Sequence, residues 1–208
     1  MRNIVAAWLF AMLPLAVSAQ VLPALHDVTG VASDDVLNLR AAPNAKAHVL
    51  ATLPPNATGV EVVSISPDGQ WGQVSLGESM GWARLTYLKP ADHPAWFTLQ
   101  TDLSCFGTEP FWSMTTNVTQ STVRYTTPDL GETAWLIAQS FPGQNFSPQA
   151  VLQLAEGRVT HVAVLQGEAC SDGMSDRAFG ISARLYLANP AGEVRGNPAL
   201  LGCCSIQP

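Results

Sequence analysis

Three carboxylates stand in short glycine-containing segments of the C-terminal half: Glu109, Asp172 and Asp176. Carboxylates that lie close together can bind Ca²⁺, or they can split their pKa values and act as the acid and base of a hydrolase. The Asp172-Gly173-x-x-Asp176 spacing lacks the further ligands of a helix-loop-helix calcium loop. In the competing interpretation Asp172 bonds local amide groups in a turn, and Arg177 pairs with Glu109 or Asp176. We expect the turn, and we assign no metal and no cofactor.

The four cysteines form an even set: Cys105, Cys170, Cys203 and Cys204. In an exported chain the oxidising compartment makes disulfides the default state. A bond between the adjacent Cys203 and Cys204 would close a strained ring, so we expect Cys105 and Cys170 each to pair with one of them, in either order. A metal or redox site is the alternative, but no C-x-x-C occurs and the four histidines have no ligand spacing.

Nucleophilic catalysis has little support in the sequence. No Gly-x-Ser-x-Gly elbow and no phosphate-binding glycine loop is present. His161 stands in a strand-like run with no evident partner. Phe111 and Trp112, close to Glu109, are expected in a core or at its rim rather than as a sugar platform. The sequence therefore predicts a protein without enzymatic activity.

Three aromatic residues of the N-terminal half, Trp71, Trp82 and Tyr87, are candidates for a ligand groove. Aromatic faces offer a peptide or glycan a large contact area at small entropic cost. Packing is the competing interpretation, and the one we favour for Trp71 and Trp82, because a small domain needs every large side chain in its core.

The composition limits the class of partner. The 208 residues include 10 Lys and Arg against 16 Asp and Glu, for a formal charge of −6. Nucleic acid and anionic membrane surfaces require clustered basic residues, and no basic run is present. We therefore expect neither as the main partner.

Residues 1–19 resemble a secretory signal peptide. Arg2 supplies the positive charge, an apolar stretch runs from Ile4 to Val17, and Val17-Ser18-Ala19 ends in the small residues that a signal peptidase recognises. The apolar stretch is short for a bilayer crossing, which favours cleavage after Ala19 over an uncleaved anchor. We expect export to the periplasm or the extracellular space, with no integral membrane segment after cleavage.

The remaining chain divides near residue 92, where two prolines, Pro90 and Pro94, disfavour regular structure. Residues 20–91 contain no cysteine and form the first expected module; residues 92–208 contain all four and form the second. Short alternating runs in the first module, including a Pro67-Asp68-Gly69 hairpin signal, predict five or so strands in a small barrel or sandwich. We expect an all-β protein.

The sequence of the second module also predicts β-structure. Apolar residues occupy the odd positions from 181 to 187, as in a half-buried strand. Residues 151–165 fit a hairpin, with a short helix at 147–155 as the weaker alternative. We expect seven or eight antiparallel strands in a barrel or sandwich linked by disulfides.

Residues 26–89 resemble a bacterial SH3 domain. The resemblance rests on Leu37-Asn38-Leu39-Arg40-x-x-Pro43, on Trp71-Gly72-Gln73-Val74 and on Gly81-Trp82-Ala83, in the family's order and spacing. It implies a small SH3-like barrel that docks on cell-wall peptides or on protein partners, and it implies no catalysis.

The second module resembles an uncharacterised family of exported bacterial proteins and lipoproteins, some linked to META-type domains. Its motifs are Gly-Thr-Glu-Pro-Phe-Trp at 107–112, Cys-Ser-Asp-Gly-Met-Ser-Asp-Arg at 170–177 and Gly-Cys-Cys at 202–204. This resemblance implies no particular activity.

Together these features predict an exported, non-enzymatic envelope protein that binds peptidoglycan or an envelope protein. The alternative is a carboxylate-based hydrolase or Ca²⁺-binding module centred on Glu109, Asp172 and Asp176. An inhibitor or structural chaperone is a third possibility that the sequence does not separate from the first.

Overall fold

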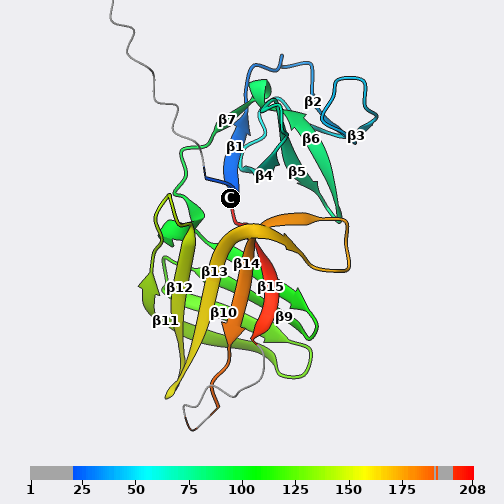
Figure 1. Cartoon of the computed structure of the whole chain (residues 1–208). Coiled ribbons are helices and arrows are strands. Elements are labelled where there is room, and N and C mark those ends of the chain that lie inside the picture. The colour runs from blue at the N-terminus through cyan, green and yellow to red at the C-terminus, as the bar shows by residue number, and fades with distance from the viewer. Residues whose placement is uncertain (1–20, 190, 192–198) are drawn as a thin grey trace, which may run out of the picture.

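Two all-β modules make up the described part of the chain (Figure 1). The computed structural model describes residues 21–189, 191 and 199–208, and within these ranges no helix has the length and hydrophobicity to cross a membrane. The first module is a seven-stranded sheet and the second is a closed eight-stranded barrel. The all-β prediction is confirmed, whereas the expected signal segment, residues 1–19, lies outside the described residues.

The first module has the strand order β3-β2-β6-β5-β4-β1-β7. Its strands are β1 (Ala24–Val28), β2 (Leu37–Arg40), β3 (Val49–Leu53), β4 (Val60–Ile65), β5 (Trp71–Leu76), β6 (Ser79–Arg84) and β7 (Leu88–Pro90). The predicted hairpin turn joins β4 to β5, with Gly69 at φ 70° and its N–H donating to the carbonyl oxygen of Ser66. Alternate side chains form a small apolar core: Val28, Leu37, Leu39, Val60, Val62, Val74, Ala83 and Leu88.

The barrel is a meander in which each strand pairs antiparallel with the next and the last pairs with the first. Its strands are β8 (Leu103–Thr108), β9 (Phe111–Asn117), β10 (Thr122–Thr127), β11 (Gly131–Phe141), β12 (Gln149–Glu156), β13 (Val159–Ser171), β14 (Ala178–Tyr186) and β15 (Leu200–Ile206). The prediction of a disulfide-linked barrel or sandwich of seven or eight strands is confirmed as an eight-stranded barrel. The weaker helical alternative at 147–155 is wrong, because β12 occupies that segment.

Both disulfides lie where the barrel closes. Cys105 of β8 is bonded to Cys204 of β15, and the two residues are directly opposite each other in the β8–β15 register. Cys170 of β13 is bonded to Cys203. The expected pattern is confirmed and its order is resolved. The first bridge closes a loop with a sequence separation of 99 residues, which in the chain-entropy model stabilises the folded state by roughly 4–5 kcal/mol.

The segment between the modules is part of the barrel core. A short 3₁₀ turn, Trp96–Thr98, buries Trp96 and Phe97, and both rings belong to the same apolar cluster as Leu103 and Leu152 of the barrel. Leu25 of β1 joins this cluster as well. The proline-marked junction is therefore a packed joint, in which aromatic side chains bury apolar area that an exposed linker would leave in water.

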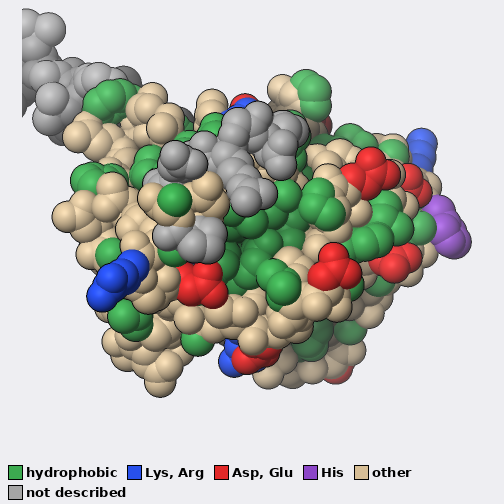
Figure 2. All heavy atoms as spheres, turned by 90° about the horizontal axis from the view of Figure 1, so that it is seen from below, with side chains coloured by type: hydrophobic (Ala, Val, Ile, Leu, Met, Phe, Trp, Pro, Cys, Tyr) green, Lys and Arg blue, Asp and Glu red, His purple; other side chains and the backbone are tan. Residues whose placement is uncertain are grey.

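At the end of the barrel that faces away from the first module, acidic side chains surround an area of hydrophobic ones (Figure 2). Figure 2 shows hydrophobic side chains gathered toward the middle of this face, with Asp and Glu side chains around them. This distribution agrees with the formal charge of −6.

A buried carboxylate from the first module reaches the last barrel strand. Oε1 of Glu61 on β4 accepts a hydrogen bond from the N–H of Ile206 on β15 at 3.0 Å. Burial raises the pKa of Glu61, and the Ile206 N–H, the charge of Arg177 and the Ser205 hydroxyl oppose that rise. The carboxylate thus bonds the two modules directly, although its ionised form is costly there.

We predict that Glu61→Gln removes the loss of folding stability that the ionisation of Glu61 causes as the pH rises. The raised pKa means that the folded protein holds the proton more tightly than the unfolded chain, so the Glu61 contribution to stability is greatest at low pH. It declines as the pH rises from the ordinary value of 4.5 through the raised folded pKa. Urea denaturation across pH should show Glu61→Gln gaining stability relative to the wild type with rising pH, and no gain at acidic pH.

Two further variants control this experiment. Glu61→Ala leaves the Ile206 N–H without an acceptor and should lower the free energy of unfolding by about 1–3 kcal/mol. Glu109→Gln, at an exposed turn position outside the joint, is the matched control for the same change of side chain. A constant difference between wild type and Glu61→Gln at every pH would contradict the prediction.

Candidate functional site

The β13–β14 loop is a turn held together by Asp172. Its Oδ1 accepts hydrogen bonds from the N–H groups of Met174 and Ser175 at 3.0 and 2.9 Å, and its Oδ2 accepts one from the Ser175 hydroxyl at 2.7 Å. These bonds, led by that from the Ser175 N–H, lower the pKa of Asp172. The carboxylate is therefore committed to its own loop, as the turn interpretation predicts.

Arg177 does not make the expected ion pair. Its Nη2 donates to the Ser205 hydroxyl at 2.8 Å, and its guanidinium lies 4.4 Å from the centre of the Phe179 ring. No salt bridge joins it to Glu109 or Asp176 within the described residues, so the predicted pairing is wrong. The β13–β14 hairpin directs Arg177 toward β15 and the joint with the first module, where Glu61 supplies the nearby negative charge.

The three carboxylates do not form one cluster. Glu109 and Asp172 line a shared hollow of about 460 Å³, but Asp176 does not line it. No group of three His, Cys, Asp or Glu side chains in the described ranges could hold a metal ion. This geometry gives the hydrolase or Ca²⁺ alternative no converged set of carboxylates.

His161 is a core histidine with both ring nitrogens occupied. Its Nδ1 accepts the N–H of Ala188 at 3.1 Å, which leaves Nε2 as the donor to Glu156 Oε2 at 3.2 Å. The ring also packs 4.5 Å from that of Trp135. The sequence did not reveal these partners of His161. Their contacts hold the ring in place within the barrel.

The packing where β8 pairs with β15, the barrel seam, explains two of the unusual motifs. The indole Nε1 of Trp112 donates to the carbonyl oxygen of Leu201 at 3.1 Å. A Cβ at Gly107 or at Gly202 would overlap the Trp112 ring. The motifs at 107–112 and 202–204 therefore meet because glycines on β8 and β15 leave room for one buried ring.

The first module carries a groove of about 600 Å³. Trp71 lines it with only 4% of its surface exposed, whereas Tyr87 lines it at 40% exposure. Trp82 is half-buried on β6 and does not line the groove. Of the three aromatic candidates, the structure therefore brings together Trp71 and Tyr87 and leaves Trp82 outside.

Charged and polar side chains complete this first groove. Arg84 lies over the Trp71 ring, 5.4 Å from its centre, and Arg40 is anchored by donation to the carbonyl oxygen of Ala47 at 2.9 Å. Asp35 and Asn38 also line the groove. Asp35 and Arg84 were not predicted as groove residues, although both lie close in sequence to residues of the motifs.

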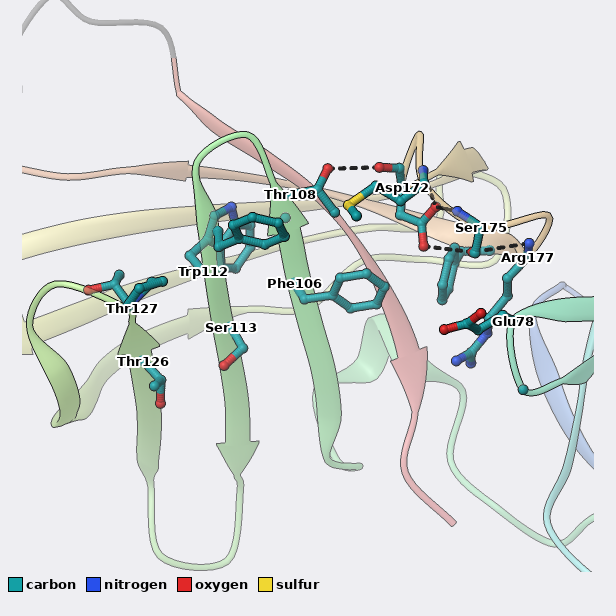
Figure 3. A pocket seen from close by; sticks show the side chains of 16 residues that line it. Glu78, Phe106, Thr108, Trp112, Ser113, Thr126, Thr127, Asp172, Ser175 and Arg177 are labelled. Carbon is teal, nitrogen blue, oxygen red and sulfur yellow. Dashed lines mark hydrogen bonds between the residues drawn. The ribbon is translucent and has the colours of Figure 1, made fainter.

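A second groove, of about 800 Å³, lies between the modules (Figure 3). Its floor is formed by β8, β9 and the end of β10, one side by the Asp172–Arg177 loop, and another by Gly77 and Glu78 of the β5–β6 turn. No local sequence pattern indicates this groove, because its walls are contributed by four separate segments.

Comparison with protein-family models, curated proteins and solved structures finds no match to this chain.

We predict that Asp172→Ala loosens the β13–β14 loop, whereas Asp176→Ala does not. Loss of the Asp172 hydrogen bonds should lower the free energy of unfolding by about 1 kcal/mol at neutral pH. Because the folded pKa is depressed, the Asp172 contribution is present above the ordinary value of 3.8 and is lost as the pH falls through the folded pKa. Chemical denaturation of both variants at neutral and acidic pH tests this, and equal effects of the two substitutions would contradict it.

Proposed function

We propose that the protein is an exported, non-enzymatic binding protein whose first module is a bacterial SH3-like domain that docks on a cell-wall peptide or on an envelope protein. The observation that carries the proposal is the first groove, where Tyr87 exposes an aromatic face beside Arg84 and Asp35. Aromatic-lined grooves of this size bind extended peptides, because a flat ring provides contact area without a large loss of side-chain entropy.

The charges of the first groove suit a short peptide with ionised groups. Arg40 and Arg84 provide positive charge for a carboxylate, and Asp35 provides negative charge for an amine. Arg84 is stacked on Trp71 and Arg40 is tied to a main-chain carbonyl, so both are held in place before a ligand arrives. Such preorganisation reduces the entropic cost of binding.

Export is supported by the chemistry of the cysteines. All four are paired and no described cysteine is free, a state typical of oxidising compartments. Together with the signal-like segment at residues 1–19, the disulfides favour the periplasm or the extracellular space. The barrel then provides a second binding surface on the same exported protein.

The test is retention of the mature protein by purified peptidoglycan. We expect the wild type to be retained and Tyr87→Ala to bind at least about tenfold more weakly, as for an aromatic residue at the centre of an interface. Phe146→Ala is the matched control, since Phe146 is 86% exposed and does not line the first groove.

Chemical cross-linking in the producing cell provides the protein-partner arm of the test. A cross-linked envelope protein that is lost in Tyr87→Ala supports the proposal with a protein ligand. If the wild type is neither retained by peptidoglycan nor cross-linked to a partner, the proposed function is wrong.

A further inference from the structure

The second groove has a floor of alternating rings and hydroxyl groups. Phe106 on β8 is directly opposite Ser113 on β9, and Ser113 is opposite Thr126 on β10. In the next row Thr108 is opposite Phe111. Directly opposed residues of antiparallel strands project from the same face about 5 Å apart, so these side chains form one continuous platform, part of which Figure 3 shows.

Two apolar side chains of this groove are exposed to solvent. Phe111 has 55% of its surface exposed and Met174 has 70%, and both line the groove. Phe106 is held edge-on against Phe179, with ring centres 5.2 Å apart. The groove thus combines one ring in a fixed orientation with apolar surface that folding leaves uncovered.

Two of the three charged residues of this groove make contacts within the protein. Asp172 accepts hydrogen bonds from its own loop; Arg177 donates to Ser205 through Nη2 and lies against the Phe179 ring, while its Nε is buried without a hydrogen-bond partner in the described part of the chain. The third, Glu78, has no hydrogen bond or ion pair within the described ranges. The hydroxyls of Ser113 and Thr126 are likewise without side-chain partners there.

The closed barrel limits how a peptide could bind to this floor. Every strand of the barrel is paired on both sides, so β8, β9 and β10 have no free edge to which a peptide strand could add. The main-chain amides of a bound peptide would depend on a few side-chain hydroxyls, and unpaired buried amides are costly. A ligand that carries its own hydroxyl groups fits the floor better.

We propose that the second groove binds an uncharged oligosaccharide. The apolar C–H faces of the sugar rings would pack on Phe106 and Phe111, and the sugar hydroxyls would exchange hydrogen bonds with Ser113, Thr126 and the Glu78 carboxylate. A carboxylate accepts hydrogen bonds from such hydroxyls without requiring a positively charged partner. This inference goes beyond the proposed function and does not depend on the first groove.

Isothermal titration of the mature protein with soluble tetrasaccharides tests the proposal. The probes are β-1,4-linked tetramers of N-acetylglucosamine and of glucose, with an uncharged tetrapeptide as the competing class. We expect at least one tetrasaccharide to bind and the peptide not to bind. Binding of the peptide alone, or of none of the probes, would overturn the proposal.

Matched variants locate the site. Phe111→Ala should weaken saccharide binding at least about tenfold, and Thr126→Val, which keeps the shape of the side chain, about three- to tenfold. Thr122→Val is the control for the second, because Thr122 lies on the same strand and does not line the groove. Thermal unfolding of each variant establishes that it is folded.

Two outcomes keep this inference separate from the proposed function. Tyr87→Ala should bind the tetrasaccharide as the wild type does, because Tyr87 lines only the first groove. Saccharide binding that survives both Phe111→Ala and Thr126→Val would place the sugar elsewhere and overturn the inference while leaving peptide docking intact. Saccharide binding that is lost in Tyr87→Ala would place the sugar in the first groove and also overturn the inference.

Discussion

The pairing of β15 with β8 is the contact on which the rest of the structure depends. It closes the barrel between strands nearly a hundred residues apart in sequence, so the chain must be ordered over the whole barrel before this contact forms. The Cys105–Cys204 bridge crosses the pairing, and the Cys170–Cys203 bridge ties the β13–β14 hairpin to it. The Trp112 ring covers the same seam at Gly202. The cysteines of the motifs, together with Gly107 and Gly202, thus all contribute to closing the barrel at the β8–β15 pairing.

Residues of the paired strands β15 and β8 also form hydrogen bonds that hold the joint and one side of the second groove. From β15, Ile206 bonds Glu61 of the first module, and Ser205 holds Arg177 of the hairpin loop. On its other side the loop is fixed by the Thr108 hydroxyl, which donates to the carbonyl oxygen of Asp172 at 2.8 Å. The loop is therefore held over β8, where it forms one side of the second groove.

Local patterns in the sequence were sufficient for the fold class, and long-range contacts account for what they missed. The Pro67-Asp68-Gly69 turn and the alternation at 181–187 act within a few residues, so the sequence alone predicted them correctly. The partner of Arg177 depends on how the β13–β14 hairpin bends, and the register shift between Gly167 and Cys170 has no sequence signal. For the same reason the second groove, assembled from distant segments, could not be foreseen, whereas Trp71 and Tyr87 of the first groove are marked by their local motifs.

Closure has a chemical consequence for recognition. A closed barrel offers ligands only side chains, because its main-chain groups are already paired. Whatever binds to β8 and β9 must therefore be recognised by rings and hydroxyl groups such as Phe106 and Ser113. The first module supplies Glu78 to that groove from the β5–β6 turn, and the two modules are packed together at the joint. The second groove is thus complete only when the first module is docked, which gives a physical reason for the packed connection at Trp96 and Phe97.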